Sequence, residues 1–93
     1  MKVGMLVKTS DWRYITLYPD EETANEIMYA NMMDPVRKAA WAQRHGVQIH
    51  NLTENIPLLV LRTGEDPRLV EVLAGDKKGW MVKYPTMIFR RVK

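Results

Sequence analysis

The side chains that could perform covalent chemistry are few. Ser10 is the only serine of the chain, and it lies in the run Thr-Ser-Asp-Trp, without the G-x-S-x-G pattern that exposes a nucleophilic serine on a tight elbow. We interpret Ser10 as a turn residue. The chain has no cysteine, which excludes a thiol nucleophile, thiolate metal ligands and disulfides.

The two histidines do not have the spacing of a metal site. His45 and His50 flank Gly46, no H-E-x-x-H pattern surrounds them, and Glu54 is the only acid nearby. We therefore expect no metal ion. We interpret His45 as a helix-end residue that contacts terminal carbonyls, and His50 as a surface residue of the following segment.

The sequence contains neither a catalytic pair of carboxylates nor a phosphate-binding loop. Glu22 and Glu26 are four residues apart and share one helical face, yet the sequence offers them no partner acid in a pocket. The glycines at 75 and 79 lack the spacing of a phosphate-binding loop and its following Ser or Thr. We predict that the protein is not an enzyme and uses no cofactor.

An acidic segment suggests binding to a protein. Residues 20–34 contain five acids and no base, and three of the seven methionines fall in or beside this segment. Methionine adapts to varied surfaces, and an acidic helical element suits a basic partner. The expected partner-binding residues are Glu22, Glu26, Met33 and Trp41. The alternative is that Met28 and Met32 only fill the core.

A basic, aromatic segment suggests a second kind of binding. Residues 77–93 contain six bases and no acid, interleaved with aromatic side chains. Base stacking combined with phosphate contacts is how sheet surfaces bind single strands. The nucleic-acid-binding residues of this alternative are Lys77, Lys78, Trp80, Lys83, Arg90 and Arg91. The competing interpretation places the aromatics in the core and the bases on an edge strand.

Length and composition define the frame for these residues. The chain has 93 residues and a net charge of +3, and 46% of its residues are hydrophobic and 27% are charged. This length and composition are typical of one globular domain, which we expect over 1–93. No apolar run approaches the ~20 residues that span a bilayer, and the start lacks the apolar region of a signal peptide. We expect a cytoplasmic protein.

The first half of the chain predicts two strands and two helices. Alternation of Val3, Met5 and Val7 predicts a strand, and residues 12–18 predict another that ends at Pro19. Asp20 is the expected N-cap of a helix with a buried stripe. That stripe consists of Ala24, Ile27, Met28 and Met32. Asp34 and Pro35 start a second helix that Gly46 ends. Its stripe consists of Val36, Ala39, Ala40 and Gln43, with Trp41 beside it and Lys38 toward the other side.

The second half predicts a series of strands. Residues 47–50 are a short strand or an extended return, and residues 58–62 are apolar on both faces, as in a central strand. Residues 67–74 fit a strand better than the alternative helix because they are short and rich in β-branched side chains. We expect a hairpin loop over 75–79, followed by strands at 80–84 and 87–92.

The two ends of the chain together resemble small bacterial and phage SH3-like modules. The run Lys2-Val3-Gly4-Met5-Leu6-Val7 resembles their K-x-G-x-x-V first strand. Residues 69–73 followed by Gly75-Asp76-Lys77-Lys78-Gly79-Trp80 are similar to their central hairpin, which often ends in Gly-Trp. The resemblance covers residues 1–18 and 57–93 and implies a small phage-type accessory or host-directed protein, in the host cytoplasm if viral.

These observations define the expected architecture and function. The fold class is α+β: a small SH3-like β-barrel or a strongly bent antiparallel sheet, with a helical hairpin inserted at about residues 20–46. The expected function is non-enzymatic binding to a partner protein. The alternative is a nucleic-acid-binding barrel.

Overall fold

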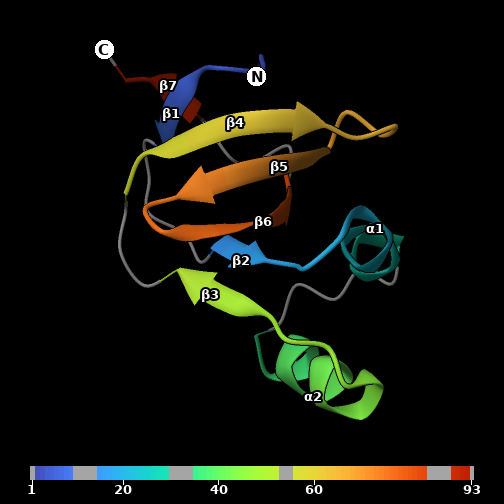
Figure 1. Ribbon diagram of the computed structural model, residues 1–93. Helices are drawn as coiled ribbons and strands as arrows, with labels where there is room; N and C mark the ends of the chain where they lie inside the picture. Colours follow the sequence, from blue (N-terminus) through green and yellow to red (C-terminus); the bar gives the residue numbers. More distant parts are fainter. Residues whose placement is uncertain (1, 10–14, 30–34, 53–55, 84–88, 93) are drawn as a thin grey trace.

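The computed structural model describes residues 2–9, 15–29, 35–52, 56–83 and 89–92 and confirms the α+β class. Antiparallel pairing joins five strands in the order β6-β5-β4-β1-β7, and β2 pairs with β3 (Figure 1). The elements are β1 (Leu6–Thr9), β2 (Ile15–Leu17), α1 (Glu21–Tyr29), α2 (Pro35–His45), β3 (His50–Leu52), β4 (Leu58–Thr63), β5 (Leu69–Ala74), β6 (Lys77–Val82) and β7 (Phe89–Arg91).

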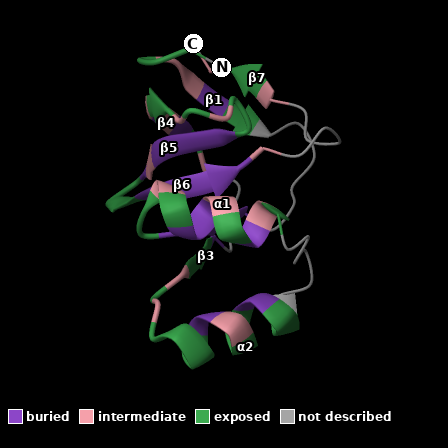
Figure 2. Ribbon diagram, turned by 90° about the vertical axis from the view of Figure 1, so that its right-hand side faces the viewer, coloured by how far each residue is buried: buried purple, intermediate pink, exposed green. Residues whose placement is uncertain are grey.

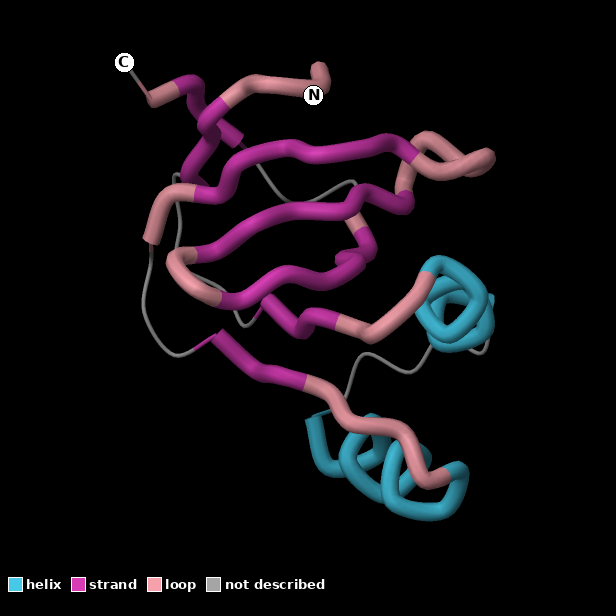
Figure 3. The backbone as a smooth tube through the Cα atoms, viewed as in Figure 1, coloured by secondary structure: helices cyan, strands magenta, loops and turns pink. Residues whose placement is uncertain are grey.

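The central strands of the sheet agree with the predictions made from the sequence. β4 is the middle strand of the five, and residues 69–74 form a strand, not a helix (Figure 3). All residues of β5 except the partly exposed Leu73 are buried, on both faces, which explains its nearly continuous apolar sequence. The expected loop at 75–79 is wrong in length: Gly75 and Asp76 alone form the turn, with Gly75 at a φ of 64°, and β6 begins at Lys77.

A β-bulge at Leu61 interrupts the pairing of β4 with β5. Val60 pairs with Val72, but the next partners are Arg62 and Glu71, so Leu61 is the extra residue. Val60 faces the inner core, and without the bulge Arg62, two residues later, would face the same side. The bulge therefore turns the Arg62 guanidinium to the opposite, outer face of the sheet.

The small β2–β3 sheet joins β6 at one point. Tyr18 and Trp80 exchange two backbone hydrogen bonds of 2.7 and 2.8 Å. Gly79 permits this approach, because a Cβ there would lie 2.7 Å from the Leu17 Cβ and 3.1 Å from the Tyr18 carbonyl oxygen. No pairing among the described strands links β3 to β7, so the sheet is not closed into a barrel.

The inner face of the sheet carries the main apolar core. Side chains of β1, β4, β5 and β6 pack there against β2 and β3. The buried members are Val7, Ile15, Leu17, Leu52, Leu58, Val60, Val70, Val72, Ala74 and Met81. Because six strands contribute, this core holds the two sheets together.

Helix α1 covers one end of the outer face, where β5 begins and β6 ends (Figures 1 and 2). Ala24 and Ile27 are fully buried there against Leu69, Trp80 and Val82, as the helical stripe predicted. Asp20 is the N-cap: its Oδ1 accepts the Thr23 N–H at 2.7 Å. The buried side chains of α1 and of the adjoining strand ends thus form a second, smaller core.

The predicted buried stripe of α2 is wrong. Val36 is 76% exposed, and Ala39, Ala40 and Gln43 are also exposed, whereas Lys38 and Ala42 are buried and Trp41 is half-buried. Positions 38, 41 and 42 share a helical face, and the large Trp41 ring selects it because alanines offer little area to bury. Burial lowers the pKa of Lys38. Gly46 ends the helix at a φ of 67°, as predicted.

The N-terminal strand is shorter than predicted. Val3 is exposed in a turn, Met5 is partly buried, and β1 begins only at Leu6. Residues 47–49 have no regular secondary structure, and the strand that follows them, β3, begins only at His50. The predictions for residues 12–14, 32–34 and 84–88 lie outside the described residues.

Candidate functional site

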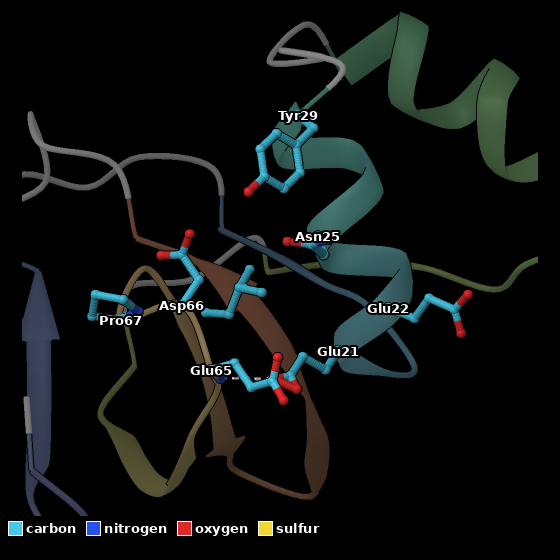
Figure 4. Close-up of a pocket in the computed structure, with 8 residues that line it drawn as sticks. Glu21, Glu22, Asn25, Tyr29, Glu65, Asp66 and Pro67 are labelled. Atoms are coloured by element: carbon cyan, nitrogen blue, oxygen red, sulfur yellow. Dashed lines mark hydrogen bonds between the residues drawn. The ribbon is translucent and has the colours of Figure 1, made fainter.

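An open hollow of about 600 Å³ lies between α1 and the loop that joins β4 to β5 (Figure 4). Four of its lining residues are acidic, and one is an aromatic from the last turn of α1. The lining comprises Glu21, Glu22, Asn25, Tyr29, Glu65, Asp66, Pro67 and Leu69. We call this the acidic groove.

Two carboxylates converge in the acidic groove from distant parts of the sequence. The Glu65 backbone N–H donates to Glu21 Oε1 at 3.0 Å, and this bond fixes the loop against the start of α1. The Glu21 carboxylate also lies so close to Gly64 that a side chain there would collide with it. Figure 4 shows the Glu21 and Glu65 side chains pointing toward each other. Their negative charges favour a cation between them.

Asp66 is already engaged by a base of its own loop. Its Oδ2 accepts from the Arg68 guanidinium at 2.7 Å, and its Oδ1 accepts from both the side chain and the backbone N–H of Arg68. The side-chain hydrogen bond from Arg68 lowers the pKa of Asp66 to about 2, and Asp66 in turn raises the pKa of Arg68. Glu21 is partly engaged as well, because its Oε1 accepts the Glu65 N–H and its charge contributes to the raised pKa of Arg62. The exposed Glu65 carboxylate is therefore the more open of the two.

Tyr29 supplies an exposed aromatic surface at the other end of the groove, two helical turns from Glu21. It is 73% exposed, and its ring projects over the groove from the last turn of α1. Asn25 lies one turn before it. Glu22 lines the rim, but its carboxylate points away from the loop (Figure 4). The groove thus has the Glu21 and Glu65 carboxylates at one end and one exposed ring at the other.

The predicted partner-binding residues are only partly brought together. Glu22 and Glu26 are both exposed on α1. Trp41 belongs to α2, where it packs against the second core and stacks on His45 with ring centroids 4.3 Å apart. Met33 lies outside the described residues. His45 Nδ1 lies 2.9 Å from the Trp41 carbonyl oxygen, which confirms the predicted contact of this histidine with a helix-end carbonyl.

The predicted nucleic-acid-binding residues are dispersed. Trp80 is only 6% exposed, and the Arg62 guanidinium lies 5.5 Å from its ring centroid, so the ring is not open for base stacking. β6 and β7 form opposite edges of the five-stranded sheet. Lys77 and Lys78 face opposite sides of β6, as Arg90 and Arg91 do on β7. Lys83 follows β6 and is half-buried.

The described part of the chain shows no cluster of three or more His, Asp or Glu side chains suited to a metal ion. Within the same residues, no helix is long and apolar enough to cross a membrane.

Sequence reasoning missed Glu65 and Tyr29. Tyr29 follows Glu22 and Glu26 at helical spacing, so the exposed face of α1 could have indicated it. No local pattern could have indicated Glu65, because it contacts Glu21, which lies 44 positions away in the sequence.

Comparison with known proteins adds no relative. No protein-family model matches the chain, and no curated protein or solved structure is significantly similar to it.

Proposed function

We propose that the protein is a non-catalytic binding module whose acidic groove holds a basic segment of a partner protein. The observation that carries this proposal is the convergence of Glu21 and Glu65 at one end of a groove that has the exposed Tyr29 ring at its other end. A guanidinium placed between these carboxylates would gain charge-assisted hydrogen bonds. A second side chain of the same basic segment would meet the Tyr29 ring, two helical turns or about 12 Å farther along α1.

The size and openness of the groove support a side chain as the occupant. About 600 Å³ is enough for an arginine or lysine and part of its backbone, and it lies within the usual range of ligand pockets. Glu22 and Glu26 extend the negative charge along α1, where they would speed encounter with a positively charged partner.

We propose as well that the fold is an opened variant of the small SH3-like barrel. The β5–β6 hairpin leading to Gly79 and Trp80 supports this relation, since it forms from the residues that resemble the central hairpin of those modules. Both helices fall between β2 and β3, consistent with an insertion into such a barrel. A phage-type accessory role in a host cytoplasm would fit this relation.

Peptide binding tests the acidic groove. A fluorescein-labelled peptide of alternating Arg and Ala is titrated with the protein, and anisotropy reports the bound fraction. A matched peptide of alternating Glu and Ala serves as the control. We expect the arginine peptide alone to bind, with an affinity that falls as salt screens the charges.

A pair of charge-matched variants locates the binding. Glu65→Gln removes one negative charge from the groove, whereas Asp76→Asn removes one from the distant β5–β6 turn. We expect the first to weaken binding by about fivefold and the second by less than about twofold. Equal losses, or no binding of the arginine peptide at low salt, would refute the groove as the site.

A further inference from the structure

The outer face of the sheet carries a row of leucines that neither core includes. Leu6 on β1 pairs with Leu59 on β4, and Leu59 pairs with Leu73 on β5, so the three side chains lie side by side across the strands. Each is partly exposed, and none belongs to the core clusters on either face. We call Leu6, Leu59 and Leu73 the leucine row.

Bases flank the leucine row. Lys78 on β6 pairs with Leu73 and continues the row, while Lys8 on β1 pairs with Arg90 on β7 beside it. All three bases are exposed. They share the outer face, because Lys8 and Arg90 alternate with inward-facing neighbours along their strands.

The one described acid of this face is unavailable to a partner. Glu71 is buried, and its two carboxylate oxygens accept from the Arg62 guanidinium at 2.9 and 3.2 Å. Arg62 reaches Glu71 because of the bulge at Leu61, and it also covers the Trp80 ring. This ion pair marks the border between the part of the face under α1 and the open part with the leucine row.

We propose that the leucine row binds an acidic amphipathic helix of a partner protein. Three leucines and Lys78 cross four adjacent strands, about 15 Å at the usual strand spacing. This distance matches roughly ten residues of helix, enough to place apolar anchors at i, i+3, i+4 and i+7. Acidic residues beside those anchors would meet Lys8, Lys78 and Arg90.

Two other classes of occupant fit this surface less well. A nucleic acid would gain phosphate contacts from the bases but would find leucines instead of an open aromatic ring on which to stack. An anionic membrane favours apolar side chains that project beyond the protein surface. The leucine row is partly buried within the sheet, so it offers little to insert. Both alternatives enter the test as competing probes.

The primary probe is a labelled synthetic peptide with Leu at helical i, i+3, i+4 and i+7 positions and Glu between them. A scrambled peptide of the same composition and a version with Lys in place of Glu are the controls. A labelled single-stranded oligonucleotide and vesicles of phosphatidylserine and phosphatidylcholine test the other occupants. We expect the patterned acidic peptide to bind and the scrambled and basic peptides to bind at least about tenfold more weakly.

Neighbouring residues on opposite faces of one strand provide matched variants. Arg90→Gln and Lys78→Gln remove charge from the outer face, whereas Arg91→Gln and Lys77→Gln remove the same charge from the adjacent position. We expect the outer variants to weaken binding by roughly two- to fivefold each, with the inner variants unchanged. Leu73→Gln, with its fold verified by circular dichroism, should weaken binding by more than about tenfold.

Several outcomes would overturn the proposal. Equal losses from Arg90→Gln and Arg91→Gln would show that net charge, not the outer face, governs binding. Equal binding of the scrambled peptide would exclude an amphipathic helix, and preference for the oligonucleotide or the vesicles would assign the face to another partner. The leucine row shares no residue with the acidic groove, so Glu65→Gln should leave binding of this peptide unchanged. Failure at one surface is therefore distinguishable from failure at the other.

Discussion

The outer face of one sheet has two halves that differ in what covers them. Under α1, the side chains of Leu69, Trp80 and Val82 are buried against the helix. At the other end, beside the β5–β6 turn, the leucines of the leucine row remain partly exposed and are flanked by bases. The same strands therefore contribute to a closed core at one end and an open apolar surface at the other.

The Arg62–Glu71 ion pair separates the half of this face that stabilises the fold from the half that is open to a partner. Arg62 lies over the Trp80 ring and neutralises Glu71, so no unpaired charge reaches the covered half at this point. The covered half supplies burial, which stabilises the fold. The open half can contribute such burial only when something docks on it. Substitutions should therefore affect stability on one side of Arg62 and binding on the other.

Truncating one apolar side chain in each half gives the largest expected contrast. Ile27→Ala empties a fully buried site under α1 and should lower the free energy of unfolding by about 3 kcal/mol. Leu59→Ala, in the leucine row, should lower it by about 1 kcal/mol because the side chain is already partly in water. Urea unfolding followed by far-UV circular dichroism measures both values. Equal losses would mean that the open half is as important to the fold as the covered half.

Adjacent positions on β6 sharpen the contrast further. Gly79→Ala places a methyl group against Leu17 and the Tyr18 carbonyl oxygen, so β2 must shift, and we expect a loss of about 2 kcal/mol. Lys78→Ala, one residue earlier on the outer face, should change stability by less than about 0.5 kcal/mol. The same unfolding assay applies. A Gly79→Ala variant as stable as the parent would show that β2 does not pack closely on β6 in solution.

The N-cap of α1 tests how firmly the helix covers its half. Asp20→Ala removes the acceptor of the Thr23 N–H and should cost about 1 kcal/mol, whereas Asp20→Ser should recover most of it. Amide hydrogen exchange should show faster exchange in the first turn of α1 in the alanine variant and unchanged exchange in β4. Loss of protection throughout the sheet would contradict a local capping role.

Local patterns predicted most of the elements. The Asp20 cap, the Ala24 and Ile27 stripe, the Gly46 stop and the central strand at 58–62 all follow from short-range rules and are confirmed. The prediction of the buried face of α2 was wrong. The apolar residues of this helix are mostly alanines, so the position of Trp41 determined which face packs against the rest of the protein.

Features that join distant parts of the sequence escaped prediction. The contact of Glu65 with Glu21 and the pairing of Arg62 with Glu71 depend on strand register and on a bulge that no local pattern marks. The basic runs at 77–78 and 90–91 are clear in the sequence, but alternation along a strand divides each run between two faces. The sequence therefore showed which charges exist, and the sheet decided which of them lie together.

The smallest expected effect is the loss, at acidic pH, of the stability that Asp66 contributes in the loop beside α1. Arg68 lowers the pKa of Asp66 from 3.8 to about 2, so the folded state holds this proton less tightly than the unfolded state does. The stability gained from Asp66 is therefore complete above pH 3.8 and disappears as the pH falls toward 2.

An Asp66→Asn variant isolates this contribution. The difference between parent and variant in the free energy of unfolding should be constant above pH 3.8 and shrink toward zero near pH 2. Arg68→Gln should move the NMR titration midpoint of the Asp66 carboxyl upward, toward 3.8, because it removes the charged guanidinium that donates two hydrogen bonds to this carboxyl. A midpoint near 3.8 in the unmodified protein would show that the Arg68 contact does not persist in solution. The loop that lines the acidic groove would then be less firmly shaped than the half of the sheet that α1 covers.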